Sequence, residues 1–136
     1  MPQLQKFSTN TITPFFGVVG QARTGIFRSY ADETAQLVGL TDKEMAYILG
    51  MTPRHLHRLT DDQRLSTDAS ERLLLLKNIL VHALDTFNEK KQVVLQWLRT
   101  PLNELNNQSP IQMMDTVTGF SLVNDVLGRL DYGLSA

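Results

Sequence analysis

Helix start and stop signals divide residues 29–136 into short segments, and this feature restricts the possible folds more than any other. The start signals place Ser or Thr at a cap position before an acidic residue or a proline, at Ser29 with Asp32, Thr41 with Glu44, Thr52–Pro53 and Ser109–Pro110. Between them, apolar residues recur at intervals of three and four, as on one face of a helix. Residues 1–26 lack this period. We therefore predict an all-α protein preceded by an irregular arm, residues 1–28, with at most a short strand.

Composition excludes several classes of protein. The chain has 136 residues, 42% of them hydrophobic and 20% charged, which is typical of a globular protein. It has no cysteine, and its histidines (His55, His57 and His82) have no carboxylate at ligand spacing, so we expect surface histidines and no metal site. Without a phosphate-binding glycine loop, a GxSxG elbow or an HExxH pattern, we expect no enzyme and no cofactor. The apolar stretches are shorter than the roughly 20 residues that cross a bilayer, and no secretory signal precedes them, so we expect no membrane contact and a cytoplasmic protein.

Residues 41–60 have the spacing of a helix-turn-helix. Two helices that cross through a short turn need a small residue at the crossing, a glycine in the turn and apolar residues on the second helix. These positions hold Ala46, Gly50, Leu56 and Leu59. The outward face of the second helix, which enters the DNA major groove in such motifs, then carries Thr52, Arg54, His57 and Arg58. An ordinary helical hairpin with a solvated polar face would show the same pattern.

The charge balance predicts weak DNA binding by a single copy. Residues 41–64 carry four basic and four acidic side chains, whereas Lys and Arg contacts to phosphates supply most non-specific affinity. We therefore expect a dimer or a larger complex, whose linked contacts add.

A long helix over about residues 68–87, capped by Asp68 and Glu71, has more leucines than one face requires. We predict a homodimer surface at Leu73, Leu74, Leu76 and Leu80; a central core helix is the alternative.

The remaining residues, 88–136, are expected to form a small domain that follows a helix-turn-helix and dimerisation domain at residues 29–87. A helix should begin at Asn88 and end before Pro101, and a short one should follow Ser109–Pro110. From about Thr118, apolar residues recur at intervals of three and four up to Leu134. Such a helix either docks on its own core or inserts into the groove of a partner.

The order of residues in 94–133 resembles the C-terminal domain shared by the Xre, MbcA and ParS antitoxins. The residues that carry it are Trp97–Leu98, Thr100–Pro101, Leu105, Ser109–Pro110, Met114, Asp115, Gly119, Val123, Leu127, Arg129 and Gly133. With an Xre-like helix-turn-helix at 41–60, the resemblance covers about residues 29–136. Asn106–Asn107 stands where the family usually has a glycine pair; because Asn tolerates left-handed backbone, we expect the turn to persist.

This resemblance implies the antitoxin of a type II toxin–antitoxin pair whose RES-domain toxin consumes NAD. It further implies that the C-terminal segment covers the entrance of the toxin active site, and that the complex represses its own operon through operator DNA. Carried onto this sequence, the toxin-facing residues are Arg129, Asp131, Tyr132, Gly133, Leu134, Ser135 and Ala136. As a flexible tail, they would offer close backbone approach at Gly133 and a carboxylate at Ala136 to a pocket for an anionic dinucleotide. The alternative function is a stand-alone transcriptional regulator whose C-terminal domain only dimerises.

Overall fold

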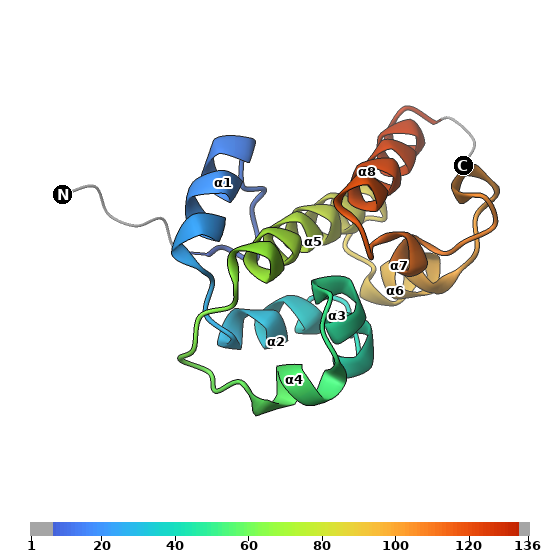
Figure 1. Cartoon of the computed structure of the whole chain (residues 1–136). Coiled ribbons are helices and arrows are strands. Elements are labelled where there is room, and N and C mark those ends of the chain that lie inside the picture. Colours follow the sequence, from blue (N-terminus) through green and yellow to red (C-terminus); the bar gives the residue numbers. More distant parts are fainter. Residues whose placement is uncertain (1–6, 134–136) are drawn as a thin grey trace.

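The computed structural model describes residues 7–133, and within this range the regular elements are all helical, as predicted. In chain order they are α1 (Phe15–Thr24), α2 (Ser29–Gln36), α3 (Asp42–Leu49), α4 (Pro53–Arg58), α5 (Thr67–Thr86), α6 (Lys91–Arg99), a 3-10 turn η1 (Asn103–Leu105), α7 (Pro110–Met113) and α8 (Val117–Asp131). The 20-residue α5 runs through the middle of the molecule. Helix α1 packs on one side of it, α2 to α4 lie on another, and α6 to α8 gather at its C-terminal end (Figure 1).

The leucines of α5 form the core of a single copy. Leu73, Leu74, Leu76 and Leu80 are each 0% exposed. The predicted dimer surface at these residues is therefore wrong, and the alternative of a central core helix is correct. The reason is that α1, α3 and α8 all pack against α5, so that the chain itself covers more than one face of this helix.

The predicted irregular arm at residues 1–28 is wrong for Phe15–Thr24, which form α1. Val18 and Ala22, one turn apart, are 4% and 3% exposed and are the buried residues of this helix, which packs on α5. Glycines and outward-facing phenylalanines on the other faces obscure the helical period in the sequence.

A buried lysine holds the segment that leads into α1. Lys77 on α5 is 0% exposed, and its Nζ donates hydrogen bonds to the Thr11 carbonyl at 2.5 Å and to Thr13 Oγ1 at 2.6 Å. The Asn78 side chain accepts from the Thr13 amide and donates to the Thr13 carbonyl. Burial lowers the pKa of Lys77 to about 8, because the charged form loses its hydration. These bonds fix α1 against the central helix.

Three of the predicted helix starts are confirmed. Thr41 caps α3 in a capping box with Glu44, Thr52 caps α4 ahead of Pro53, and Ser109 caps α7. In each case the hydroxyl accepts from a backbone amide three residues later. The signal is local, and neighbouring residues alone satisfy it.

Three other helix boundaries differ from the prediction. The N-cap of α2 is Arg28 with no side-chain cap, and α5 is capped by Ser66 rather than Asp68. Helix α6 begins at Lys91, because Asn88 and Glu89 have left-handed φ angles of 56° and 63°. The Asn106–Asn107 turn persists as expected: these residues have φ angles of 57° and 63°.

Candidate functional sites

Helices α3 and α4 form the predicted helix-turn-helix. Ala46 at the crossing is 0% exposed, Gly50 in the turn has a left-handed φ of 75°, and Leu56 on α4 is 1% exposed. The Met51 amide donates to the Ala46 carbonyl at 3.0 Å and closes the turn. A left-handed φ is adopted most readily by glycine, which has no Cβ, so Gly50 favours this turn.

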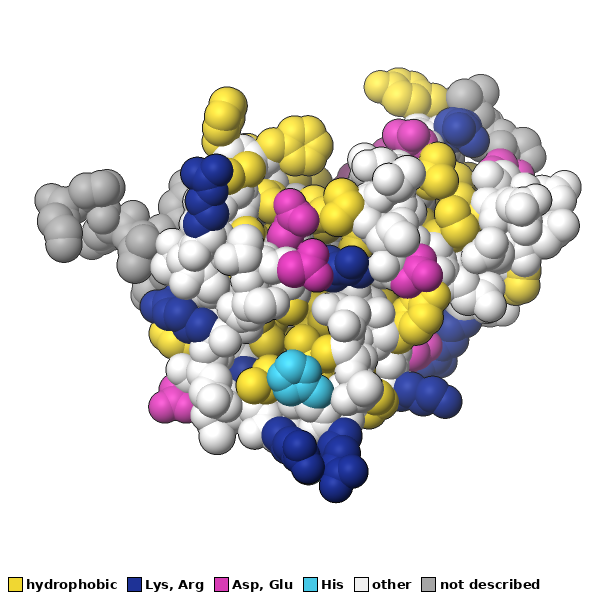
Figure 2. All heavy atoms as spheres, in the orientation of Figure 1, with side chains coloured by type: hydrophobic (Ala, Val, Ile, Leu, Met, Phe, Trp, Pro, Cys, Tyr) yellow, Lys and Arg dark blue, Asp and Glu magenta, His cyan; other side chains and the backbone are white. Residues whose placement is uncertain are grey.

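The polar face of α4 projects into solvent. Thr52, Arg54, His57 and Arg58 are all exposed, which confirms their predicted orientation. Within residues 7–133, neither Arg54 nor Arg58 forms an ion pair. Figure 2 shows Lys and Arg side chains protruding at the lower edge of the molecule, below the region that α4 occupies in Figure 1. This edge can place two guanidinium groups on a polyanion.

Arg28, which the sequence analysis did not single out, holds the end of α4 from the start of α2. Its side chain is buried, and its Nε donates to the Leu56 carbonyl near the end of α4 at 2.9 Å, while Nη1 pairs with Asp32 at 3.0 Å. Its amide also donates to the Gln63 carbonyl in the loop after α4. A cation at the C-terminal end of a helix donates hydrogen bonds to free carbonyls and is attracted by the negative end of the helix dipole. Arg28 therefore fixes the angle of the exposed basic face.

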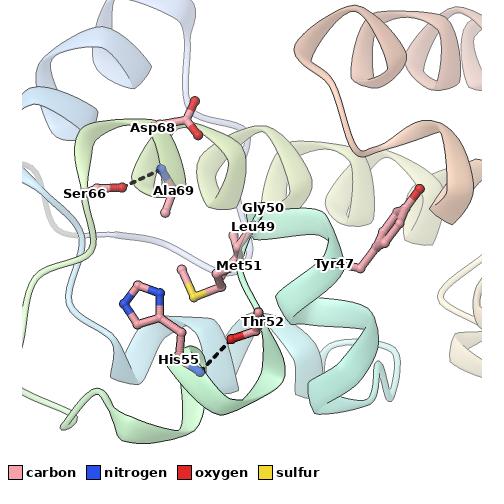
Figure 3. A pocket seen from close by; sticks show the side chains of 9 residues that line it. All are labelled: Tyr47, Leu49, Gly50, Met51, Thr52, His55, Ser66, Asp68 and Ala69. Carbon is pink, nitrogen blue, oxygen red and sulfur yellow. Dashed lines mark hydrogen bonds between the residues drawn. The ribbon is translucent and has the colours of Figure 1, made fainter.

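A hollow lies between the α3–α4 turn and the start of α5 (Figure 3). His55 and Met51 point into it, and Ser66 accepts a hydrogen bond from the Ala69 amide at its rim. The whole lining consists of Tyr47, Leu49, Gly50, Met51, Thr52, His55, Ser66, Asp68 and Ala69. Among the residues that the structure describes, no three His, Asp or Glu side chains are grouped so as to hold a metal ion, and no helix is long and apolar enough to cross a membrane.

Two polar contacts hold the C-terminal helices against α3. Arg99 on α6 donates from Nε and Nη2 to the two carboxylate oxygens of Glu44, each at 2.8 Å. The Tyr47 hydroxyl donates to the Gln112 carbonyl on α7 at 2.8 Å. The hydrogen bond from Arg99 is the largest of the effects that hold the pKa of Glu44 below its ordinary value. The C-terminal helices are thereby fixed relative to the helix-turn-helix.

The end of α8 is tied to α5 by a polar cluster that we call the His82 latch: His82, Thr86, Asn124 and Asp131. His82 Nε2 lies 2.5 Å from Asp131 Oδ2, and His82 Nδ1 lies 3.0 Å from Asn124 Oδ1. The Thr86 hydroxyl donates to Asp131 Oδ1 at 2.5 Å. The His82 side chain is 19% exposed and therefore partly buried, whereas His55 and His57 are exposed, as expected of surface histidines.

Titration favours the latch in its ionised form. Burial lowers the pKa of His82, but the hydrogen bonds to Asp131 and Asn124 outweigh burial and leave this pKa above its ordinary value of 6.5. The bond to His82, followed by the bond to Thr86, lowers the pKa of Asp131 below 3.8. An imidazolium donates from both ring nitrogens, which matches two oxygen neighbours.

The residues assigned to toxin contact differ in their surroundings. Arg129 and Gly133 are exposed, and the Tyr132 side chain is 85% exposed beyond the last turn of α8. Asp131 is bound to α5 through the latch, so the expected flexible tail is wrong up to this residue: the chain is helical there. Leu134, Ser135 and Ala136 lie outside the described residues.

A buried glycine sets the corner that leads into α8. A Cβ on Gly119 would lie 1.6 Å from the Met113 carbonyl oxygen, so the end of α7 approaches α8 more closely than any other residue allows. The Gly119 amide donates to Thr116 Oγ1, which caps the helix. This close approach explains the glycine among the residues that carry the family resemblance.

Comparison with known proteins matches both halves of the chain. The family description "Antitoxin Xre-like helix-turn-helix domain" matches residues 18–76, and "Antitoxin Xre/MbcA/ParS C-terminal toxin-binding domain" matches residues 82–133. Antitoxin Xre of Yersinia enterocolitica is 28% identical over 118 residues, which are 86% of this chain and 80% of that protein. Antitoxin Xre of Photorhabdus laumondii is 30% identical over 77 residues, 57% of this chain and 52% of the relative. A "Prs ADP-ribosylating antitoxin" of Sphingobium is 30% identical over 87 residues, 58% and 55% of the two chains.

Proposed function

Because the chain belongs to the Xre-type antitoxin family and carries both of its domains, we propose that it neutralises an NAD-consuming RES-domain toxin and represses its own operon. The observation that carries this proposal is the toxin-binding domain match, which ends at the exposed C-terminal end of α8. The name of the Sphingobium relative supports the type of toxin, because ADP-ribosylation consumes NAD. Operator DNA and NAD are both found in the cytoplasm, where we expect the protein to act.

In this proposal the C-terminal segment acts as a steric cover. Tyr132 and Arg129 belong to the residue types that dominate binding energy at protein interfaces, and both are exposed beside the latch. Because Asp131 is fixed to α5, the neighbouring Arg129 and Tyr132 are held at a defined place on the end of α8. A segment that is ordered before binding loses less conformational entropy when the toxin captures it. Neutralisation then needs no chemistry in this chain, only exclusion of substrate from the toxin.

Operator binding is assigned to α4, as a second activity of the same chain. Arg54 and Arg58 would contact base edges or phosphates, with Thr52 and His57 beside them. The segment 41–64 is neutral overall, so one copy would bind weakly and the repressing species would be a dimer or a toxin–antitoxin complex.

The toxin assignment is tested by expressing the adjacent open reading frame with and without this chain, while growth and cellular NAD are followed. The wild-type chain should preserve both. Removal of residues 134–136, or Tyr132→Ala, should restore toxicity, whereas Leu122→Ala, which alters another exposed apolar residue of α8, should not. A harmless neighbour, or protection that survives both tail variants, would contradict the proposal and favour the stand-alone regulator.

Alanine substitution of single arginines can separate the two activities, operator binding and toxin neutralisation. Arg54→Ala and Arg58→Ala should each weaken operator binding by about 1–3 kcal/mol without loss of neutralisation. Arg129→Ala, on the distant α8, is the matched control: it should leave operator binding unchanged and weaken toxin binding. Gel-shift titrations at several salt concentrations measure the first effect and NAD retention measures the second. If Arg54→Ala and Arg58→Ala also abolish neutralisation, α4 has been misassigned.

A further inference from the structure

Helix α1 carries a cluster of exposed apolar side chains that the antitoxin activities do not use. We call it the α1 patch: Ile12, Phe15, Phe16 and Val19, which are 55%, 80%, 94% and 43% exposed. Figure 2 shows apolar side chains standing out at the upper left of the molecule, where Figure 1 places α1. Isolated exposed apolar residues are ordinary, but two adjacent phenylalanines with two aliphatic neighbours on one element mark an interaction surface.

Packing within the chain does not account for this face of α1. Val18 and Ala22 supply the buried contacts of this helix, which packs on α5. Gly20, one turn after Phe16, is also unexplained internally, because a Cβ added there meets no atom within 4 Å. A glycine inside a helix costs about 0.5–1 kcal/mol relative to alanine. Open space above Gly20, beside an exposed ring, leaves room for a surface from outside the chain to approach the helix backbone.

We propose that the α1 patch is the dimer interface of this protein and that its occupant is the α1 patch of a second copy. In a two-fold interface the same surface of both copies meets, and the α1 patch offers large apolar rings beside the bare Gly20, where two helices can approach closely. Arg23 is the only charged residue in residues 7–24, so the α1 patch is apolar and needs no charged partner.

The area of the patch agrees with a specific dimer. An aromatic side chain offers about 150–250 Å², so the two phenylalanines expose about 300–400 Å² per copy. Ile12 and Val19 add to this, and two copies together approach the roughly 1,000 Å² that specific interfaces need. The leucines of α5 cannot serve this purpose, because they are buried in the core.

Charge and geometry favour antiparallel packing of the two α1 helices. If the two-fold axis passes near Val19 and Gly20, the Arg23 side chains of the two copies lie at opposite ends, about 10 Å apart along the helix axis at 1.5 Å per residue. Each guanidinium then lies beside the phenylalanines of the other copy, a favourable cation–aromatic arrangement. Parallel packing would instead bring the two arginines together.

This dimer leaves the other surfaces accessible. Helix α1 lies on the opposite side of α5 from α4, and the end of α8 lies beyond the other end of α5 (Figure 1). Two copies joined through α1 would present two α4 helices and two C-terminal segments at once. The inference rests on the proposed function in one respect: operator binding requires a dimer, and the α1 patch is proposed as the surface that forms it.

Sedimentation equilibrium of the full chain tests the proposal without toxin or DNA. The wild-type chain should dimerise at micromolar concentrations, and Phe16→Ser should weaken the dimer by at least about a hundredfold, because the ring is buried twice in a symmetric interface. Leu122→Ser, at a residue of α8 that is 42% exposed, should leave dimerisation unchanged. Melting curves should show that both variants stay folded, since Phe16 makes little contact within the chain.

The absence of native cysteine allows a second test of proximity. Gly20→Cys and Gly128→Cys each introduce a single thiol at a helical glycine whose added Cβ would meet no atom within 4 Å. Under mild oxidation, Gly20→Cys should form a disulfide-linked dimer at a rate much above that of Gly128→Cys. Equal rates for the two would show that α1 is not at the interface.

Further outcomes would also overturn the proposal. A wild-type chain that is monomeric at several hundred micromolar would do so, as would a dimer that Phe16→Ser does not weaken. If the isolated chain is monomeric and Phe16→Ser instead reduces co-purification with the neighbouring toxin, then the toxin occupies the patch. The NAD measurement above stays independent, because a monomer can still neutralise a toxin.

Discussion

Alanine substitution of two glycines in α8 should have opposite effects on stability, because the two sites differ in available space. A Cβ at Gly119 would meet the Met113 carbonyl oxygen at 1.6 Å and the Met113 carbonyl carbon at 2.7 Å. A Cβ at Gly128 would meet nothing within 4 Å. Both glycines lie in the same helix, Val117–Asp131, so helix propensity changes similarly at the two sites.

The magnitudes follow from these distances. Overpacking in a well-filled region costs about 1–3 kcal/mol, and the neighbour of Gly119 is backbone that cannot rotate away, so Gly119→Ala should cost about 3 kcal/mol. The higher helix propensity of alanine relative to glycine raises the free energy of unfolding by about 0.5–1 kcal/mol at both sites. The net expectation is a loss of about 2 kcal/mol for Gly119→Ala and a gain of about 0.5–1 kcal/mol for Gly128→Ala.

Urea unfolding, followed by circular dichroism and by fluorescence of the single tryptophan, Trp97, measures both free energies. The two variants should differ by about 3 kcal/mol, which corresponds to roughly 10 °C in Tm. A Gly119→Ala protein within about 0.5 kcal/mol of wild type would refute the close approach between α7 and α8. Destabilisation by Gly128→Ala would instead refute the claim that its site is open.

Four further substitutions test the polar contacts. The pKa of His82 is raised in the folded state, so its ion pair with Asp131 adds stability that is fully present below pH 6.5. This stability is lost as the pH rises through the folded-state pKa. The difference in unfolding free energy between wild type and His82→Asn should therefore be larger at pH 5.5 than at pH 8.5. Lys77 has the opposite sign: its pKa of about 8 means that wild type, relative to Lys77→Met, should gain stability as pH rises from 8 to 10.5, and parallel unfolding curves would contradict this. Glu44→Ala should cost about 1 kcal/mol more than Arg99→Ala in urea unfolding, because Glu44 also closes the capping box of α3.

The sequence predicts those parts of the fold that depend on neighbouring residues. The caps at Thr41, Thr52 and Ser109 join groups three residues apart, so the local sequence contains both partners. Helix α1 was not predicted, because its sequence does not show which side of the helix is buried. Its exposed side chains include Phe15 and Phe16, so hydrophobicity marks the outward side of this helix as strongly as the buried side.

The candidate sites follow the same rule. The outward face of α4 could be predicted, because Leu56 and its neighbours define which side of a short helix is buried. The contacts of Arg28 with Leu56 and of His82 with Asp131 span 28 and 49 residues, and no spacing rule links such positions. For the α5 leucines, the sequence indicates burial on several faces, but a second copy and the chain's own α1 and α8 satisfy that pattern equally.

The His82 latch divides the C-terminal end into a part held by the fold and a part that can contact a toxin. For the Asp131 carboxylate to bind a partner, it would first have to give up hydrogen bonds to His82 and Thr86, and each partner left unsatisfied costs about 1–3 kcal/mol. Tyr132 carries no such cost, because its side chain is exposed. Truncation from Asp131 would remove the latch together with the contact segment, so any loss of neutralisation could come from either. A truncation that begins after Gly133 removes no residue of the latch, so it separates toxin contact from the docking of α8.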